Sequence, residues 1–207
     1  MIRLPVPPLL VISDRSQARR PLAAIFEAAL AGGCRWFSLR EKDLPPDERR
    51  RQLGELVELG HRYGAVVTAH ADLAAVIATG ADGVHLPGGG DPAAARARLP
   101  SALIGASAHS PAEAGALLRA GADYVTLSPV FATASKPGYG PALGLAGLAD
   151  TVARAPGPVI ALGGITAANA AACVAAGASG VATMGEVMRA ADPQACIEAL
   201  VAAVSRR

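Results

Sequence analysis

One short pattern recurs along the chain and restricts the folds open to it. A stretch rich in Ala and Leu ends in glycine, and a short apolar run follows at once. Glycine suits the left-handed residue that closes a helix, while these Val/Leu runs are too short to be helices. Each run therefore predicts a strand buried on both faces, with a helix before it. The pattern occurs at Gly32-Gly33-Cys34, Gly64, Gly80-Ala81-Asp82, Gly121-Ala122-Asp123 and Gly177-Ala178-Ser179.

The apolar runs add up to about eight strands, with helical stretches between most of them. Such alternation is typical of parallel βαβ units, and eight of them close into a (β/α)8 barrel, for which 207 residues is near the lower limit. An open doubly wound sheet is the alternative, but it places its glycine-rich turn after the first strand. We therefore predict an α/β fold, a single TIM barrel over residues 1–207. The expected strands lie near 8–12, 35–39, 65–69, 82–86, 102–106, 123–127, 158–162 and 180–183, and expected helices include 47–63, 111–120, 166–176 and 192–205.

Charge and composition exclude several classes of partner. The net charge is only +2, and no Lys/Arg block is present, which argues against nucleic-acid binding. No apolar run is long enough to cross a bilayer. The apolar segment Pro5–Ile12 is short and holds three prolines, which favours a buried strand over a signal peptide. Three widely spaced cysteines indicate core residues in a reducing cytoplasm rather than disulfides or a zinc site.

Two glycine turns late in the chain predict a phosphate site. Gly163-Gly164-Ile165-Thr166 follows the seventh strand and opens a helix, and Met184-Gly185 follows the eighth. Glycines let a ligand approach the backbone, and a helix N-terminus presents free N–H groups to an anion. In barrels of this class, the loops after strands seven and eight recurrently hold phosphate. The alternative is ordinary tight-turn chemistry.

The triplet Arg40-Glu41-Lys42 ends the second predicted strand. Side chains alternate along a strand, so Arg40 and Lys42 should lie on one side and Glu41 on the other. Two cations at the barrel mouth can hold a phosphate or pyrophosphate. A solvated cluster of rim salt bridges with Glu41 and Asp43 is the alternative.

A long loop and three histidines also lie at the predicted mouth. The loop Phe131–Gly140 carries two hydroxyls and a lysine among Gly and Pro, a composition suited to a lid over an anion. A surface loop rich in turn-forming residues is the alternative. His70, His85 and His109 each stand at or near a strand end, so at least one is expected to contact ligand. No spacing of His and carboxylates indicates a transition-metal site.

These turns, in this order, resemble the thiamine phosphate synthase/TenI family nearly from end to end. The resemblance rests on segments that include Leu39-Arg40-Glu41-Lys42, Gly80–Leu86, Gly105–Ser110, Ser128–Gly138 and Ala161–Thr166. It implies a barrel that handles thiamine precursors. A synthase joins hydroxymethylpyrimidine pyrophosphate to a thiazole phosphate and releases pyrophosphate, with Mg2+ neutralising the charge. The TenI branch includes a thiazole tautomerase.

The resemblance also implies roles for individual residues. Arg40 and Lys42 match the pyrophosphate-binding cations, and Thr133, Ser135 and Lys136 match a Thr-x-Thr-Lys loop, with Ser in place of the second Thr. The residues expected to take part directly in catalysis are Arg40, Lys42, Ser107 and Lys136. The residues expected to contact substrate are Ser38, His70, His85, His109, Thr133, Ser135, Gly163, Gly164, Met184 and Gly185.

Some positions depart from the synthase pattern. Ala71 and Gly90 stand where synthases carry two aspartates that bind Mg2+, and Asp72 and Asp91 lie one position later. Asp72 and Asp91 are therefore the candidate metal ligands, and Mg2+ is the candidate cofactor. Ser38 replaces a pyrimidine-binding Gln. Three functions stay open: a synthase, a TenI-type tautomerase or another small phosphate-ester reaction with His70 or His109 as acid/base, and a non-catalytic binder of thiamine phosphate or a precursor.

The expected partners are small phosphorylated pyrimidine and thiazole substrates, with no nucleic acid and no membrane. The expected location is cytoplasmic. A homodimer is one assembly left open.

Overall fold

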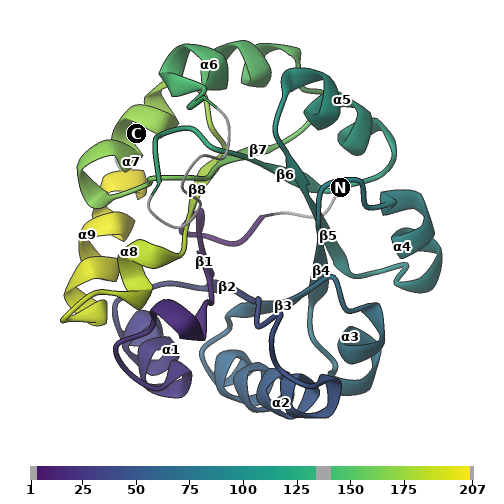
Figure 1. Cartoon of the computed structure of the whole chain (residues 1–207), viewed down its shortest axis with the longest axis vertical. Coiled ribbons are helices and arrows are strands. Elements are labelled where there is room, and N and C mark those ends of the chain that lie inside the picture. Colours follow the sequence, from purple (N-terminus) through teal and green to yellow (C-terminus); the bar gives the residue numbers. More distant parts are fainter. Residues whose placement is uncertain (1–3, 134–140, 206–207) are drawn as a thin grey trace.

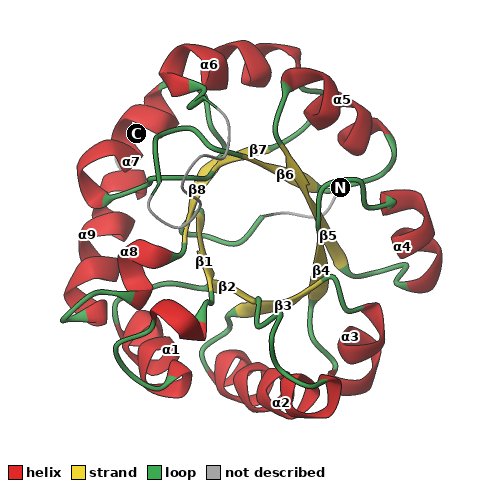
Figure 2. Ribbon diagram, in the orientation of Figure 1, coloured by secondary structure: helices red, strands yellow, loops and turns green. Residues whose placement is uncertain are grey.

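Eight parallel strands close into a barrel, and the helices lie around its outside (Figure 1, Figure 2). The computed structural model describes residues 4–133 and 141–205. Each strand pairs with its neighbour in the chain, and β8 pairs with β1 through Leu10 and Ala182. The strands are β1 (Leu9–Ile12), β2 (Trp36–Leu39), β3 (Val66–His70), β4 (Gly83–Leu86), β5 (Leu103–Ala108), β6 (Tyr124–Leu127), β7 (Val159–Ala161) and β8 (Gly180–Thr183).

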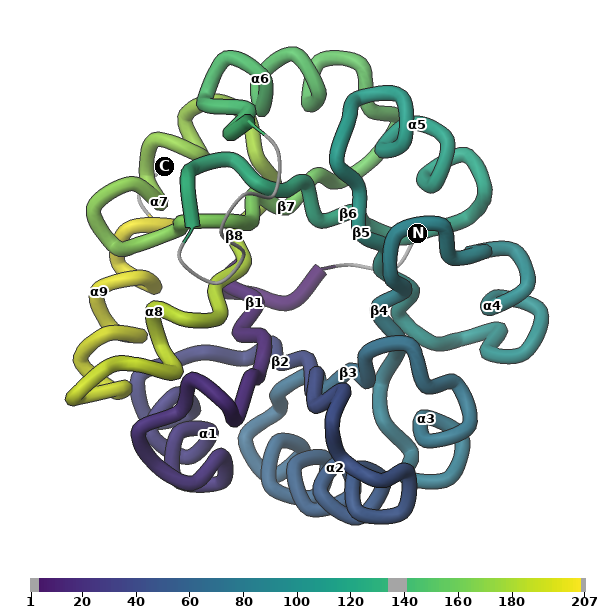
Figure 3. The backbone as a smooth tube through the Cα atoms, in the orientation of Figure 1, coloured from purple at the N-terminus to yellow at the C-terminus, as the bar shows by residue number. Residues whose placement is uncertain are grey.

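The chain winds once around the barrel, so its first and last strands meet side by side (Figure 3). Helices connect the successive strands on the outer face, which is the arrangement that parallel strands require. These helices are α1 (Leu22–Ala31), α2 (Pro46–Arg62), α3 (Leu73–Thr79), α4 (Pro92–Arg98), α5 (Pro111–Arg119), α6 (Gly144–Arg154), α7 (Ala167–Ala175) and α9 (Pro193–Ser205). None of the helices in the described parts is long and apolar enough to cross a membrane.

Local sequence explains where several helices begin and end. Pro46, Pro92 and Pro111 each stand in the first turn of a helix, where the missing N–H costs nothing and φ is already suitable. Gly80 closes α3 in the left-handed conformation, with φ of 69°. These signals place each following strand at a defined point on the barrel.

The core has an outer and an inner part. The outer part lies between the strands and the helices and contains most of the buried Leu, Val and Ala side chains. The inner part fills the barrel, where Trp36 and Tyr124 pack edge to face with ring centroids 4.8 Å apart. The interior of the barrel is therefore packed with side chains, and a ligand can bind only at an end of the barrel.

The predicted barrel and all eight predicted strands are confirmed, with shifts of one or two residues at their ends. Strand β5 runs two residues further than expected, because Ser107 pairs in register with Thr126 of β6. Two short helices at the strand ends were not expected from the sequence, η1 (Arg15–Gln17) and α8 (Gly185–Met188).

Candidate active site

A cavity of about 490 Å³ opens at the carboxyl ends of the strands. This is the end of a (β/α)8 barrel at which enzymes carry out their chemistry. It collects residues from most of the strands and their following loops. The predicted site residues on its wall are Arg40, Lys42, His70, His85, Ser107, His109, Thr133, Gly163, Gly164, Met184 and Gly185.

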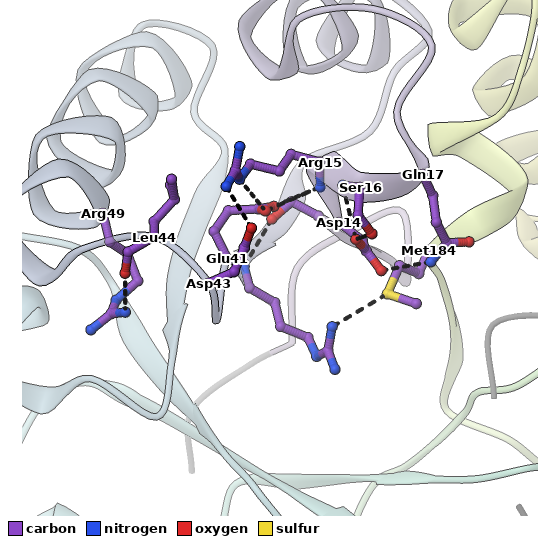
Figure 4. Close-up of polar contacts among 11 residues, drawn as sticks. Asp14, Arg15, Ser16, Gln17, Glu41, Asp43, Leu44, Arg49 and Met184 are labelled. Atoms are coloured by element: carbon purple, nitrogen blue, oxygen red, sulfur yellow. Dashed lines mark hydrogen bonds and ion pairs between the residues drawn. The ribbon is translucent and has the colours of Figure 1, made fainter.

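Arg40 and Lys42 both line the cavity, as the alternation along β2 predicts, and Glu41 does not. Glu41 instead accepts a hydrogen bond from the Arg15 backbone N–H at 3.0 Å, and Asp43 pairs with the Arg15 side chain (Figure 4). Across the described residues, no carboxylate forms an ion pair with Arg40 or Lys42. The rim carboxylates therefore neutralise Arg15, and the two cavity cations are left for an anionic ligand.

Burial shifts a pKa in the Arg40-Glu41-Lys42 turn. It lowers the pKa of Lys42, and the neighbouring Arg40 charge lowers it further. An anion bound between these two cations would offset their mutual repulsion and raise the pKa of Lys42 again. The site is thus electrostatically suited to a ligand with several negative charges.

The Gly163-Gly164 turn forms the opposite wall. Both glycines have positive φ, 96° and 63°, and a Cβ atom at Gly164 would lie 2.5 Å from the Ala132 carbonyl oxygen. The amide of Asn169 holds the turn in place by donating to the Gly164 carbonyl oxygen at 2.9 Å. Within the described residues, the backbone N–H groups of Gly164 and Ile165 have no acceptor. Unpaired donors at the start of α7 form an anion cradle.

A buried hydrogen-bond chain lies beneath the cavity. The Tyr124 hydroxyl lies 3.1 Å from His85 Nδ1, and His85 Nε2 lies 3.0 Å from the Ser107 hydroxyl. Burial raises the pKa of Tyr124, so its proton stays on the phenol and is donated to Nδ1. Neutral His85 then carries its own proton on Nε2, which faces the Ser107 hydroxyl and, at 3.4 Å, the Thr126 hydroxyl; the shorter distance favours Ser107 as the acceptor. The Ser107 proton is consequently left for a ligand in the cavity.

His85 is expected to make folding stability depend on pH. Burial lowers its pKa to about 3, helped by the charges of His70 and Arg40. The unfolded chain binds a proton near pH 6.5 and the folded chain does not, so stability falls as pH drops from about 6.5 towards 3. The expected loss between pH 8 and pH 5 is about 2 kcal/mol. Urea unfolding at both pH values measures it.

The His85→Gln variant provides the control for this pH dependence. Its absolute stability will be lower because the hydrogen-bond chain changes. The difference between its pH 8 and pH 5 unfolding free energies should shrink by about 2 kcal/mol relative to the natural protein. If this difference is the same in the variant and in the natural protein, groups other than His85 cause the pH dependence.

The other two histidines also reach the cavity. The His70 ring stacks near His85, with centroids 5.7 Å apart. His109 lies 3.5 Å from Glu113 through Nδ1 and faces the Gly88 turn. Both rings line the cavity together with Arg40 and Ser107, within the set that the sequence predicts to contact substrate.

The two candidate metal ligands are engaged elsewhere. Asp72 caps α3 through the Ala75 N–H at 2.9 Å and pairs with Arg49 at 2.9 Å. Asp91 caps α4 through the Ala93 N–H at 2.9 Å. The described residues contain no cluster of three or more His, Cys, Asp or Glu side chains that could hold a metal ion. These residues do not fit a magnesium site built from carboxylates.

Three of the residues predicted to take part in catalysis or contact substrate lie outside this cavity wall or outside the described chain. Ser38 is 2% exposed and does not line the cavity; its buried hydroxyl has no hydrogen-bond partner in the described residues. Ser135 and Lys136 fall outside the described residues. Conversely, the structure adds Arg189 to the cavity wall and Tyr124 to the support beneath it. Neither had a sequence signal of its own, since both depend on contacts between distant segments.

A comparison with known protein families shows which family the chain belongs to. Residues 9–187 match the family model described as thiamine monophosphate synthase. The chain belongs to this family. The predicted resemblance to the thiamine phosphate synthase/TenI family is therefore confirmed.

Individual relatives of this thiamine monophosphate synthase family member cover nearly its whole length. A thiamine-phosphate synthase of Methanoculleus marisnigri is 40% identical over 93% of this chain and 92% of its own. One from Roseiflexus castenholzii is 38% identical over 95% of this chain and 88% of its own. The solved thiamine phosphate pyrophosphorylase of Pyrococcus furiosus superposes with a TM-score of 0.86 and 32% identity, covering 95% of this chain and 94% of that one.

Proposed function

We propose that the protein is a thiamine phosphate synthase, an enzyme of thiamine biosynthesis that joins hydroxymethylpyrimidine pyrophosphate to a thiazole phosphate. The observation that carries this proposal is a single cavity with an anion site on each side. Arg40 and Lys42 stand on one side, and the open amides of Gly164 and Ile165 stand on the other. A reaction between one pyrophosphate ester and one phosphate ester needs both sites. The synthase relatives favour this function over the TenI-type tautomerase.

The chemistry follows from the two sites. The bond between the pyrimidine methylene carbon and the pyrophosphate oxygen breaks, and pyrophosphate leaves with the electron pair. The thiazole nitrogen then forms a bond to that carbon. Arg40 and Lys42 stabilise the charge growing on the leaving group, and Ser107 donates a hydrogen bond in the same cavity. The roles of Thr133, Ser135 and Lys136 as a lid over the pyrophosphate stay predictions, as do a cytoplasmic location and a homodimer.

A turnover assay tests the proposal directly. The purified protein is given both substrates, and thiamine phosphate and pyrophosphate are measured together. We expect the two products to appear in equal amounts. Binding of both substrates without any product would show a binding protein instead, and the synthase function would be wrong.

Magnesium should matter little for holding pyrophosphate in this protein. Ala71 and Gly90 occupy the two expected ligand positions, and a Cβ atom at Gly90 would lie 2.7 Å from the Leu86 side chain. Since the protein supplies cations and not carboxylates there, we expect pyrophosphate affinity to change less than about threefold between chelator and excess Mg2+. Calorimetric titration under both conditions measures this.

Two variants sharpen the magnesium experiment. Ala71 already has a left-handed backbone, φ of 61°, which Asp tolerates better than most residues. Ala71→Asp is therefore expected to fold, whereas Gly90→Asp is expected to displace Leu86 and lose stability. A steep rise of pyrophosphate affinity with Mg2+ in the natural protein would show that Asp72 and Asp91 do bind the metal.

A further inference from the structure

Arg189 follows α8 and lies on the cavity wall beside Gly185. A Cβ atom at Gly185 would stand 2.6 Å from Nη2 and 2.7 Å from Cζ of Arg189, so the guanidinium occupies the space above this glycine. Gly185 is not among the residues with positive φ. Its backbone conformation therefore does not require glycine, and a side chain there would displace the Arg189 guanidinium from this position. Gly185 and Arg189 act as a unit that brings a cation over the turn after β8.

The charge of Arg189 is not neutralised by the protein. In the described part of the chain its side chain has no carboxylate partner, and its hydrogen-bond acceptor is the neutral Oε1 of Gln17. Most other arginines near the rim are paired, as Arg15 is with Asp43 and Arg49 with Asp72. An unpaired guanidinium on a cavity wall keeps its full attraction for an anion.

Gln17 is itself held in one orientation. Its Nε2 donates to Asp14 Oδ2 at 2.6 Å, which turns Oε1 towards Arg189 (Figure 4 shows Gln17 beside Asp14). Asp14 also accepts from the Ser16 hydroxyl at 2.6 Å. Helix η1 thereby places an amide oxygen, rather than a carboxylate, against the guanidinium. This arrangement orients the arginine without neutralising it.

We propose that Arg189 binds the phosphate ester of the thiazole substrate together with the Gly164 and Ile165 amides, and that Gln17 is its positioning residue. This inference rests on the proposed function for the identity of the ester. The residues of the amides, Gly185 and Arg189 all line this one cavity, which offers a dianionic phosphate both backbone donors and a planar cation. Arg189 would then select phosphorylated ligands over the corresponding alcohol.

Calorimetric titration with two probes, the thiazole phosphate and inorganic phosphate, tests this inference. Arg189→Gln should weaken both by about tenfold, the small effect that suits a charge-assisted pair at an exposed residue. Arg189→Lys should recover part of the loss. Gln17→Glu should weaken both probes like Arg189→Gln, because it gives the guanidinium a carboxylate partner. The non-phosphorylated thiazole alcohol should bind the natural protein and Arg189→Gln alike.

Arg62→Gln is the matched control, since Arg62 is an exposed residue near the end of α2, outside the cavity wall. It should leave both affinities unchanged. Equal phosphate binding by the natural protein and Arg189→Gln would overturn the inference, as would tighter binding by the variant. If inorganic phosphate binds in an Arg189-dependent way but the thiazole phosphate does not bind, Arg189 still binds an anion, but its assignment to the thiazole ester and the proposed function are both wrong.

Discussion

Replacing Gly164 by valine should reduce the affinity for thiazole phosphate by about a hundredfold or more, since two charge-assisted bonds to backbone amides are lost. The new side chain meets the Ala132 carbonyl oxygen and the Phe131 Cβ, at 2.5 and 2.8 Å from its Cβ position. It also needs a backbone with φ of 63°, which a β-branched residue adopts at high cost. Calorimetry measures the affinity, and thermal unfolding measures the accompanying loss of stability.

Gly80→Ala separates the effect of the left-handed backbone from the effect of the steric clash. Gly80 has φ of 69°, close to that of Gly164, but a Cβ atom there meets nothing within 4 Å. This variant should lose about 1 kcal/mol of stability through the left-handed backbone and keep the natural affinity. If Gly164→Val binds thiazole phosphate as the natural protein does, the cradle has been assigned to the wrong turn.

Replacing Arg40 by methionine should lower kcat/KM by a factor of about 100 to 1,000, the equivalent of two charge-assisted hydrogen bonds to the leaving group. Methionine keeps much of the length and apolar stem of the side chain but has no charge. The loss should appear in kcat as well as in KM, because charge on the pyrophosphate grows as its bond to carbon breaks. Steady-state kinetics with both substrates varied separates the two parameters.

Arg51→Met supplies the comparison for Arg40. Arg51 is an exposed residue of α2 that pairs with Glu55 at 2.7 Å, and such surface pairs contribute little. Its kinetic constants should match those of the natural protein. A loss of less than about threefold for Arg40→Met would mean that Arg40 does not contact the leaving group.

Sequence patterns predict the features that depend on local periodicity. The alternation along β2 places Arg40 and Lys42 together in the cavity, and the glycine pair before α7 marks the cradle. Both conclusions follow from backbone geometry within a few residues. For the same reason, the order and boundaries of the strands could be predicted closely.

Features that depend on distant contacts escaped prediction. Arg189 gains its significance from Gln17, 172 positions away in the chain, and Tyr124 from His85 on another strand. The two aspartates illustrate a different difficulty. Asp91 precedes a proline at a helix start, a capping signal that competes with metal binding in the same few residues. Only the three-dimensional contacts show that Asp91 caps α4.

The unpaired cations of the mouth bear on how the protein behaves outside catalysis. Arg40 and Lys42 repel each other in the folded state more than in an extended chain. This repulsion at the active site lowers the stability of the ligand-free fold. Any multivalent anion that binds there stabilises the folded state by mass action. Phosphate or sulfate in a storage buffer would thus raise the melting temperature and, at the same site, compete with substrate. For this barrel, conditions that preserve the protein best are also conditions that inhibit it.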